Sequence, residues 1–226
     1  MQDIPLEAFP DYGPLLGHRD LGYVVLKRVF DVLLACLLLV CLMIAMLLIA
    51  LAIKLDSPGT VLYYQNRVGY RGRSFGMLKF RTMRPERRRQ TIPIDFPNRR
   101  RALKVANDPR ITRVGRILRR TSLDELPQLL NILCGEMSFV GPRPELPELV
   151  ARYRAQDFIR HTVVPGLTGW WQVNGRCRRE DACDPDSDLD GKLEDDMYYL
   201  LHRSLTFDAA VLVRTIPVVV SGRGAA

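Results

Sequence analysis

The chain has 226 residues, a mass of 25.8 kDa and a formal net charge of +8 at pH 7. This length allows one globular domain of ordinary size plus an attachment segment. The positive charge suits anionic partners, namely nucleic acid, acidic lipid headgroups or phosphorylated substrates. The 5 cysteines include no C-x-x-C pair and the 3 histidines are scattered, which argues against a disulfide scaffold and against a zinc site.

An apolar block near the N-terminus predicts a membrane segment. Residues 32–53 are uncharged and mostly aliphatic, close to the roughly 20 residues that a membrane-crossing helix needs. We therefore expect an N-terminal arm over residues 1–22, a membrane-embedded helical segment over 23–54 and a cytosolic domain over 55–226. The absence of paired cysteines fits a reducing compartment.

The topology of this segment is open from the sequence, because basic residues stand on both sides of it. Lys27 and Arg28 precede it, and Lys54 with several arginines follows it. A single span leaves one basic flank outside, whereas a re-entrant hairpin keeps both flanks in the cytosol. A hairpin needs a helix break, and residues 29–53 contain neither Pro nor Gly. Asp31 is expected at the membrane interface or paired with Lys27 or Arg28.

The segment after the membrane block predicts a β-hairpin. Residues 61–65 are a β-branched and aromatic run typical of a strand, a second short strand is expected at 75–80, and the basic, glycine-bearing stretch 67–73 separates them. The arginine-rich, proline-containing stretch 84–104 is predicted to be a basic loop, either a solvated surface or a contact for anionic headgroups.

Two amphipathic helices are predicted further along the chain. Residues 111–120 alternate aliphatic and basic side chains at helical spacing, so this helix packs on a core or lies on a membrane surface. Residues 206–220 form a final amphipathic segment, and Pro217 is expected to bend or end that helix.

An adjacent acidic pair, Asp124 and Glu125, allows a structural and a chemical interpretation. Ser122 and Glu125 have the spacing of a capping box before an apolar helix. The chemical alternative makes Asp124 a nucleophile, kept ionised by a helix N-terminus, and Glu125 a metal ligand. Arg119 and Arg143 could neutralise a phosphoryl group beside the pair, and the turn at residues 139–144 would hold Arg143.

Several segments, in order along the chain, together resemble the monotopic phosphoglycosyl transferases, which are bacterial sugar transferases of the PglC-like type. The matching segments are residues 27–31, 65–69, 79–83, 122–128, 137–144, 165–176 and 196–199. The resemblance implies an α+β fold: a membrane-anchored chain whose compact, mainly helical catalytic domain carries short strands and interfacial amphipathic helices.

The resemblance also implies an activity and a site. The enzyme would transfer a sugar 1-phosphate from a nucleotide sugar, usually a UDP-sugar, to polyprenyl phosphate through a phosphosugar-aspartyl intermediate, releasing nucleoside monophosphate and starting the assembly of an exopolysaccharide or glycoconjugate. Asp124 corresponds to the nucleophile and Glu125 to the Mg²⁺ ligand. The substrate-binding positions implied are Lys79, Arg81, Arg119, Arg143, Arg176 and Asp196.

The resemblance places the protein on the bacterial inner (cytoplasmic) membrane with its catalytic domain facing the cytosol, in contact with membrane lipids. Nucleic acid is not an expected partner, and a homo-oligomer is left open. Three features depart from the family pattern: Met43-Ile44 stands where a Ser-Pro pair usually breaks the membrane helix, Val164 stands where an Arg is common, and the aspartate-rich stretch 177–191 is long. The alternative function is a catalytically degenerate membrane scaffold of a glycan-assembly pathway.

Overall fold

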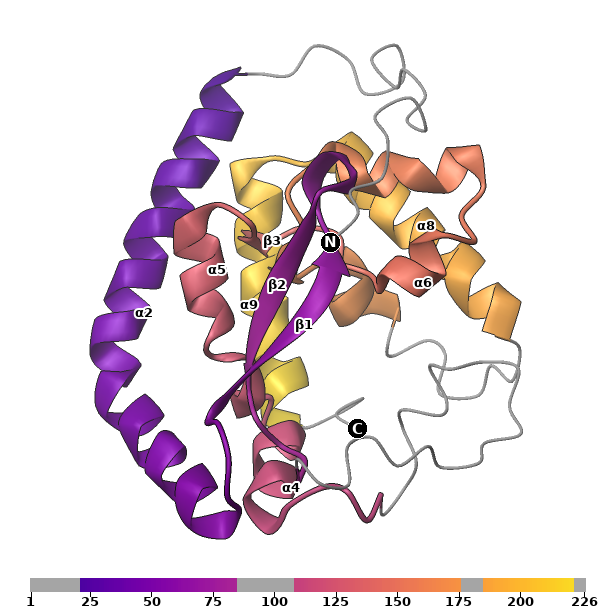
Figure 1. Cartoon of the computed structure of the whole chain (residues 1–226). Coiled ribbons are helices and arrows are strands. Elements are labelled where there is room, and N and C mark those ends of the chain that lie inside the picture. Colours follow the sequence, from indigo (N-terminus) through magenta and orange to yellow (C-terminus); the bar gives the residue numbers. More distant parts are fainter. Residues whose placement is uncertain (1–20, 85–107, 176–184, 222–226) are drawn as a thin grey trace.

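The computed structural model describes residues 21–84, 108–175 and 185–221 (Figure 1). A long N-terminal helix runs along a body made of short helices and two small sheets. The α-helices are α2 Leu21–Asp56, α4 Arg113–Arg120, α5 Gln128–Cys134, α6 Pro147–Val150, α8 Pro185–His202 and α9 Leu205–Ser221. The strands are β1 Leu62–Val68, β2 Ser74–Phe80, β3 Ser138–Val140 and β4 Gly166–Thr168, and the shorter turns are η2 Tyr70–Gly72, η3 Leu123–Glu125, η4 Ala155–Thr162 and η5 Trp171–Gly175. This mixture of helices and short strands is the α+β class that the sequence predicts.

Helix α2 contains the predicted membrane segment and is unbroken over 36 residues. At about 1.5 Å per residue it is about 54 Å long, well beyond the roughly 30 Å of a bilayer hydrocarbon core. Only 6% of its most apolar window is buried, so this is not the core helix of a soluble domain. Figure 1 shows it bowed along one edge of the molecule.

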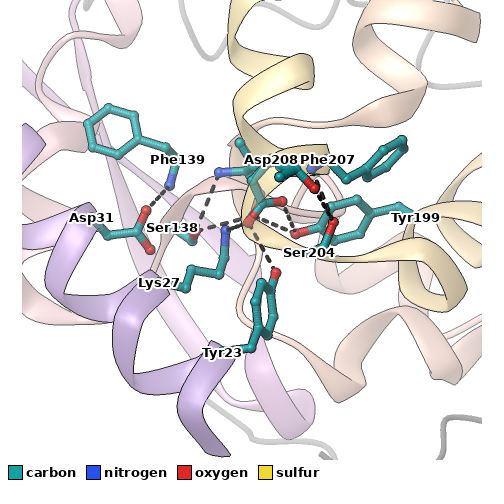
Figure 2. Close-up of polar contacts among 11 residues, drawn as sticks. Tyr23, Lys27, Asp31, Ser138, Phe139, Tyr199, Ser204, Phe207 and Asp208 are labelled. Carbon is teal, nitrogen blue, oxygen red and sulfur yellow. Dashed lines mark hydrogen bonds and ion pairs between the residues drawn. The ribbon is translucent and has the colours of Figure 1, made fainter. Parts of the chain in front are cut away.

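Both ends of α2 are attached to the same body. Near its start, Lys27 pairs with Asp208 of α9 at 2.6 Å. Asp31 accepts a hydrogen bond from the Phe139 backbone N–H at 3.2 Å, and of the two predicted partners Lys27 acts on it through its charge (Figure 2). Near its end, Asp56 accepts a hydrogen bond from the Val114 N–H at 2.9 Å. The helix therefore lies along the body rather than projecting away from it.

The predicted β-hairpin is confirmed, with β1 reaching Val68 rather than ending at residue 65. The strands pair antiparallel from Leu62 opposite Phe80 to Val68 opposite Ser74. Asn131 of α5 attaches to the free edge of β2: its side chain accepts from the Leu78 N–H and donates to the Gly76 carbonyl, both at 2.9 Å. The amide thus takes the place of a neighbouring strand and fixes β2 against α5.

The basic helix predicted at residues 111–120 is confirmed as α4, which begins at Arg113 because Ile111 pairs with Met83 as an isolated bridge. Thr112 caps its start, accepting from the Gly115 N–H at 2.9 Å. A Cβ on Gly115 would lie 2.2 Å from the Thr82 carbonyl oxygen, so only glycine permits this approach.

The predicted capping box at Ser122 is wrong. Ser122 has left-handed backbone angles (φ 57°, ψ 13°) and makes no side-chain cap hydrogen bond. Leu123–Glu125 form a single 3₁₀ turn, and α5 begins only after Pro127. Pro127 has no N–H to donate, so the helical hydrogen-bond ladder cannot run continuously from Ser122 into α5.

The C-terminal part packs on the inner face of α2. A core of buried apolar residues joins β2, α5, β3, α8 and α9, and Leu34, Leu38 and Leu39 of α2 pack against it. Helix α9 continues through Pro217 to Ser221, so Pro217 does not end it. Residues 185–191 of the aspartate-rich stretch are helical in α8 rather than a loop. The basic stretch 84–104 lies, except for Arg84, outside the described residues.

Candidate active site

The acidic pair lies in the η3 turn between α4 and α5, facing strand β2. Lys79 follows the buried Phe75 and Met77 at alternate positions of β2, so its side chain leaves the strand on the same face as theirs. The Lys79 ammonium pairs with Glu125 Oε1 at 2.7 Å, and Arg143 Nη2 pairs with the same oxygen at 2.6 Å. We call Lys79, Asp124, Glu125 and Arg143 the Asp124 cluster.

Glu125 is held as an anion by these two cations. Burial by itself favours the neutral acid, but Arg143 and Lys79 outweigh it and keep the pKa of Glu125 well below its usual range. The side chain is still 19% exposed, and its second oxygen receives no hydrogen bond from the described residues. That oxygen is a suitable ligand for a hard divalent cation, since Mg²⁺ is commonly held by one or two carboxylates together with substrate phosphates.

Asp124 differs sharply from its neighbour. It is 9% exposed and makes no hydrogen bond or ion pair with any residue in the described part of the chain. Burial raises the pKa of Asp124 to about 6, while Lys79 acts against this rise and the Glu125 charge adds to it. A helix N-terminus was expected to favour the ionised form of Asp124, but the turn is short and desolvation dominates, so the pKa of Asp124 is raised. At pH 7 a group with this pKa is about nine-tenths ionised.

The backbone of Arg143 is held in place by its neighbours. Its carbonyl oxygen accepts a hydrogen bond from Arg160 Nη2 at 3.1 Å. The turn before it packs so tightly on the start of β4 that a Cβ on Gly166 would lie 2.2 Å from the Gly141 nitrogen. The predicted rigid turn at residues 139–144 is thus present, and it directs the guanidinium toward Glu125.

The other predicted site residues lie in different places. Arg119, half-buried in the last turn of α4, acts on Asp124 through its charge. Arg81 is 5% exposed and donates to the Ser57 and Pro58 carbonyls, both at 2.6 Å, so it closes the C-terminal end of α2. Arg176 lies outside the described residues.

Asp196 belongs to a second group of charges, which sequence reasoning missed. It pairs with Arg160 at 2.7 Å, and Arg160 and Lys192 both reach Glu145 Oε1, at 3.4 and 3.0 Å. We call Glu145, Arg160, Lys192 and Asp196 the Glu145 cluster. One signal was available, because Lys192 and Asp196 have the i,i+4 spacing of a helical ion pair. Nothing in the sequence brings Arg160 or Glu145 to them.

The geometry suits attack on a phosphorus atom. It combines Asp124, which has no hydrogen bond to the described residues, with a carboxylate held as an anion and with cations from three different segments of the chain. A phosphoryl group beside Asp124 would lie within the field of Lys79, Arg119 and Arg143.

The chain is similar to proteins that are named as sugar-phosphate transferases. The sequence profile of the family described as "Bacterial sugar transferase" matches residues 22–222. A UDP-glucose:undecaprenyl-phosphate glucose-1-phosphate transferase of Escherichia coli K12 is 38% identical over 219 residues, covering 96% of this chain and 44% of the relative. The exopolysaccharide production protein ExoY of Sinorhizobium fredii is 39% identical over 208 residues, covering 88% of each chain.

A third relative carries a different sugar in its name. The UDP-N-acetylgalactosamine-undecaprenyl-phosphate N-acetylgalactosaminephosphotransferase of Aeromonas hydrophila is 38% identical over 209 residues, covering 90% of this chain and 45% of the relative. The chain therefore spans less than half the length of the Escherichia and Aeromonas relatives, but most of the length of ExoY.

Proposed function

This chain belongs to the bacterial sugar transferase family, and on that premise we propose that it transfers a sugar 1-phosphate from a UDP-sugar to polyprenyl phosphate. The single observation that carries the proposal is Asp124: a buried carboxylate, without hydrogen bonds to the described residues, beside cations that suit a diphosphate. The substrates named for the relatives, UDP-sugars and undecaprenyl phosphate, are the ones that such a site would bind.

In the first step, an Asp124 carboxylate oxygen attacks the phosphorus atom that carries the sugar. The bond from this phosphorus to the bridging oxygen of the diphosphate breaks, and its electron pair leaves with nucleoside monophosphate. In the second step, a phosphate oxygen of the lipid attacks the same phosphorus, and the Asp124 carboxylate is released. Lys79, Arg119 and Arg143 neutralise the charge that gathers on the phosphoryl oxygens.

Mg²⁺ fits the same site. Glu125 would hold the ion through its second oxygen, together with the substrate phosphates, and the bound ion would supply further neutralisation of the diphosphate. Among the described residues, no group of three or more His, Cys, Asp or Glu side chains gathers as a ready-made metal site. A site completed by the substrate is therefore the arrangement we propose.

The attachment of both ends of α2 to one body bears on topology. A helix crossing the bilayer would separate Lys27 from Asp56 by the membrane, yet Lys27 binds α9 and Asp56 binds α4. We propose that α2 enters the bilayer from one face only, with the globular body in the cytosol at the inner membrane. Because the helix is unbroken, it would lie along that face and would not form the re-entrant hairpin, which needs a break.

Thiol labelling in sealed vesicles of known orientation tests this topology. Cys134 is an exposed free thiol of α5 and reports the side of the body. A Leu6→Cys variant reports the side of the N-terminal arm. An impermeant maleimide, with labelled peptides identified by mass, should modify both positions from the same side. Labelling from opposite sides would establish a single span.

The activity is tested by mixing detergent-solubilised protein, Mg²⁺, polyprenyl phosphate and a panel of nucleotide sugars, and measuring the release of nucleoside monophosphate. Release is expected with a UDP-sugar and only when Mg²⁺ is present. Folded protein that releases nothing across the panel would refute the transferase proposal and favour the scaffold alternative. The scaffold would also retain its cellular function with Asp124→Asn.

A further inference from the structure

A groove of about 360 Å³ lies between the N-terminal half of α2 and the start of α9, away from the Asp124 cluster. Its volume falls in the roughly 300–1,000 Å³ range of small-molecule sites. The walls come from three elements: Phe30 and Leu33 of α2, Phe139 and Val140 of β3, and Ala209 and Leu212 of α9.

The lining of this groove suits hydrocarbon. Nine of its 12 lining residues are apolar, and the others are Lys27, Asp31 and Asp208. These charged groups already have partners within the protein: Lys27 donates to Asp208 at 2.6 Å, and Asp31 accepts from the Phe139 N–H at 3.2 Å. Figure 2 shows Lys27, Tyr23 and Tyr199 converging on Asp208. Charges paired in this way attract no headgroup, so an apolar chain is the occupant that the groove favours.

The groove adjoins the surface that would meet the lipid. Leu33 on its α2 wall is 65% exposed, and on α9 Val213 and Ile216 are 66% and 62% exposed. Large apolar side chains exposed on neighbouring helices mark a membrane-facing surface. A hydrocarbon chain could therefore enter the groove directly from the bilayer, without crossing water.

Strand β3 and the turn that follows it connect this groove to the proposed site. Val140 lines the groove, and Arg143, three positions later, binds Glu125. At about 3.3 Å per residue, the backbone between them spans at most about 10 Å. A lipid whose phosphate reaches the Asp124 cluster therefore has this groove within reach of its chain. The proposed reaction requires the acceptor phosphate to reach the Asp124 cluster, whereas it makes no such requirement of the phosphate of a bulk phospholipid.

We propose that the groove between α2 and α9 holds part of the polyprenyl chain of the acceptor lipid while its phosphate is at the Asp124 cluster. The inference rests on the proposed function and adds where the acceptor chain is bound. The groove would raise the affinity for long-chain acceptors and would not contribute to binding of the nucleotide sugar.

Two adjacent alanines of α9 give a matched test. Ala209 and Ala210 are both exposed, but only Ala209 lines the groove. Ala209→Trp should fill the groove and raise the KM for a long polyprenyl phosphate at least about tenfold, by excluding a few methylene groups from burial. Ala210→Trp should change that KM less than about twofold. Both variants should keep the wild-type KM for the nucleotide sugar.

The length of the acceptor chain provides a second arm. With a phosphate carrying a chain too short to reach the groove, Ala209→Trp and Ala210→Trp should have equal KM values. The pair Ala209→Asn and Ala210→Asn, which places a small polar group at each position, covers the case in which a tryptophan variant fails to fold. Thermal unfolding of each purified variant identifies such a failure.

Photo-crosslinking tests occupancy without turnover. A polyprenyl phosphate with a diazirine in its chain should label groove peptides containing Leu33 or Leu212, and unlabelled polyprenyl phosphate should compete better than a diacyl phospholipid. Equal competition by the phospholipid would overturn the inference, as would equal KM values for the matched pair in an active enzyme. If the wild-type protein is active, these results bear on the groove alone. If the wild-type protein has no transferase activity, the proposed function fails and the inference fails with it.

Discussion

The Asp124 cluster and the Glu145 cluster are built from the same residue types and share one loop, yet they use their charges differently. Burial raises the pKa of Asp124 and of Asp196 to about 6 in both cases. Asp196 lies 2.7 Å from the Arg160 guanidinium, whereas Asp124 makes no ion pair within the described chain. A buried charge with a close partner supports structure, and one without a partner is available for chemistry.

The loop that contains Arg143 and Glu145 links the Glu145 cluster to the Asp124 cluster. The Arg143 guanidinium binds Glu125 and its backbone carbonyl accepts from Arg160, so the buried Glu145 cluster holds the main chain of a residue in the partly open Asp124 cluster. Within the Glu145 cluster, the Lys192 ammonium binds Glu145 and lies 4.2 Å from the centre of the Trp171 ring. The difference between the clusters predicts which substitutions should affect turnover and which should affect stability.

The largest effect is expected from Asp124→Asn. Removing the nucleophile should lower the kcat for nucleoside monophosphate release by at least about 10³-fold. The thermal unfolding midpoint should stay equal or rise, because a neutral amide of the same shape replaces a buried carboxylate that has no hydrogen bond to the described part of the chain. Asp196→Asn serves as the matched control and should lower the midpoint. A turnover-competent Asp124→Asn enzyme would remove the distinction between the clusters.

The next largest effect is expected from Arg160→Met, which leaves the buried Asp196 without its cation. Breaking a buried pair in this way should cost about 3–5 kcal/mol of unfolding free energy, measured by denaturant titration in detergent. The exposed Arg152 offers a control, and Arg152→Met should change stability by no more than about 0.5 kcal/mol. Equal losses in the two variants would show that the Glu145 cluster does not support the fold.

Arg143→Lys should separate geometry from charge. A lysine keeps the positive charge but loses the planar fork that reaches Glu125 Oε1. We expect the kcat to fall about 10²-fold, because a displaced cation stabilises the transition state poorly. The unfolding free energy should change by less than about 1 kcal/mol, since the main-chain bond to Arg160 remains. A drop in stability without a drop in kcat would reverse the role given to this residue.

The smallest effect is a pH dependence at His161, which is buried beside the Glu145 cluster. Burial, with the nearby Arg160 charge, lowers the pKa of His161 to about 3. Below about pH 6.5, His161 is therefore protonated in the unfolded chain but stays neutral in the folded protein. The free energy of unfolding falls as the pH drops through this range. Between pH 7 and pH 5 this group should cost about 2 kcal/mol.

Asp196 acts with the opposite sign, because its raised pKa makes the folded state take up a proton between about pH 6 and pH 4. The measurement is therefore the difference between wild type and His161→Gln in unfolding free energy at pH 7 and pH 5. The variant should lose less stability on acidification than the wild type. Identical changes in the two proteins would mean that His161 does not titrate in this range.

The sequence predicted the elements that depend on local pattern. Residues 32–53 are apolar on every side and become part of α2, and the short strand predicted at residues 75–80 becomes β2. Asp124 and Glu125 stand next to each other in the chain, so any fold keeps them together. Lys79 was identified only through the ordered motifs of a family resemblance, whereas Arg143 was also predicted from the turn that precedes it. The structure brings both to Glu125.

The contacts that the sequence did not predict depend on residues distant in the chain. Ser122 has the letter pattern of a cap, but Pro127 and a left-handed backbone prevent it. Arg81, which was predicted to bind substrate, donates to the Ser57 and Pro58 carbonyls at the end of α2. A local pattern does not identify such partners, because a guanidinium can donate hydrogen bonds to the free carbonyls at a helix end as well as to a phosphate.

By itself, the sequence determined that the chain carries a long apolar helix, a basic surface and an adjacent acidic pair, because each is written in consecutive residues. Only the tertiary structure decided that both ends of α2 attach to one body, that Asp196 belongs to a buried ion cluster, and that Asp124 has no partner among the described residues. The reason is physical: burial and pairing set the pKa and the availability of a carboxylate, and both depend on residues far away in the chain.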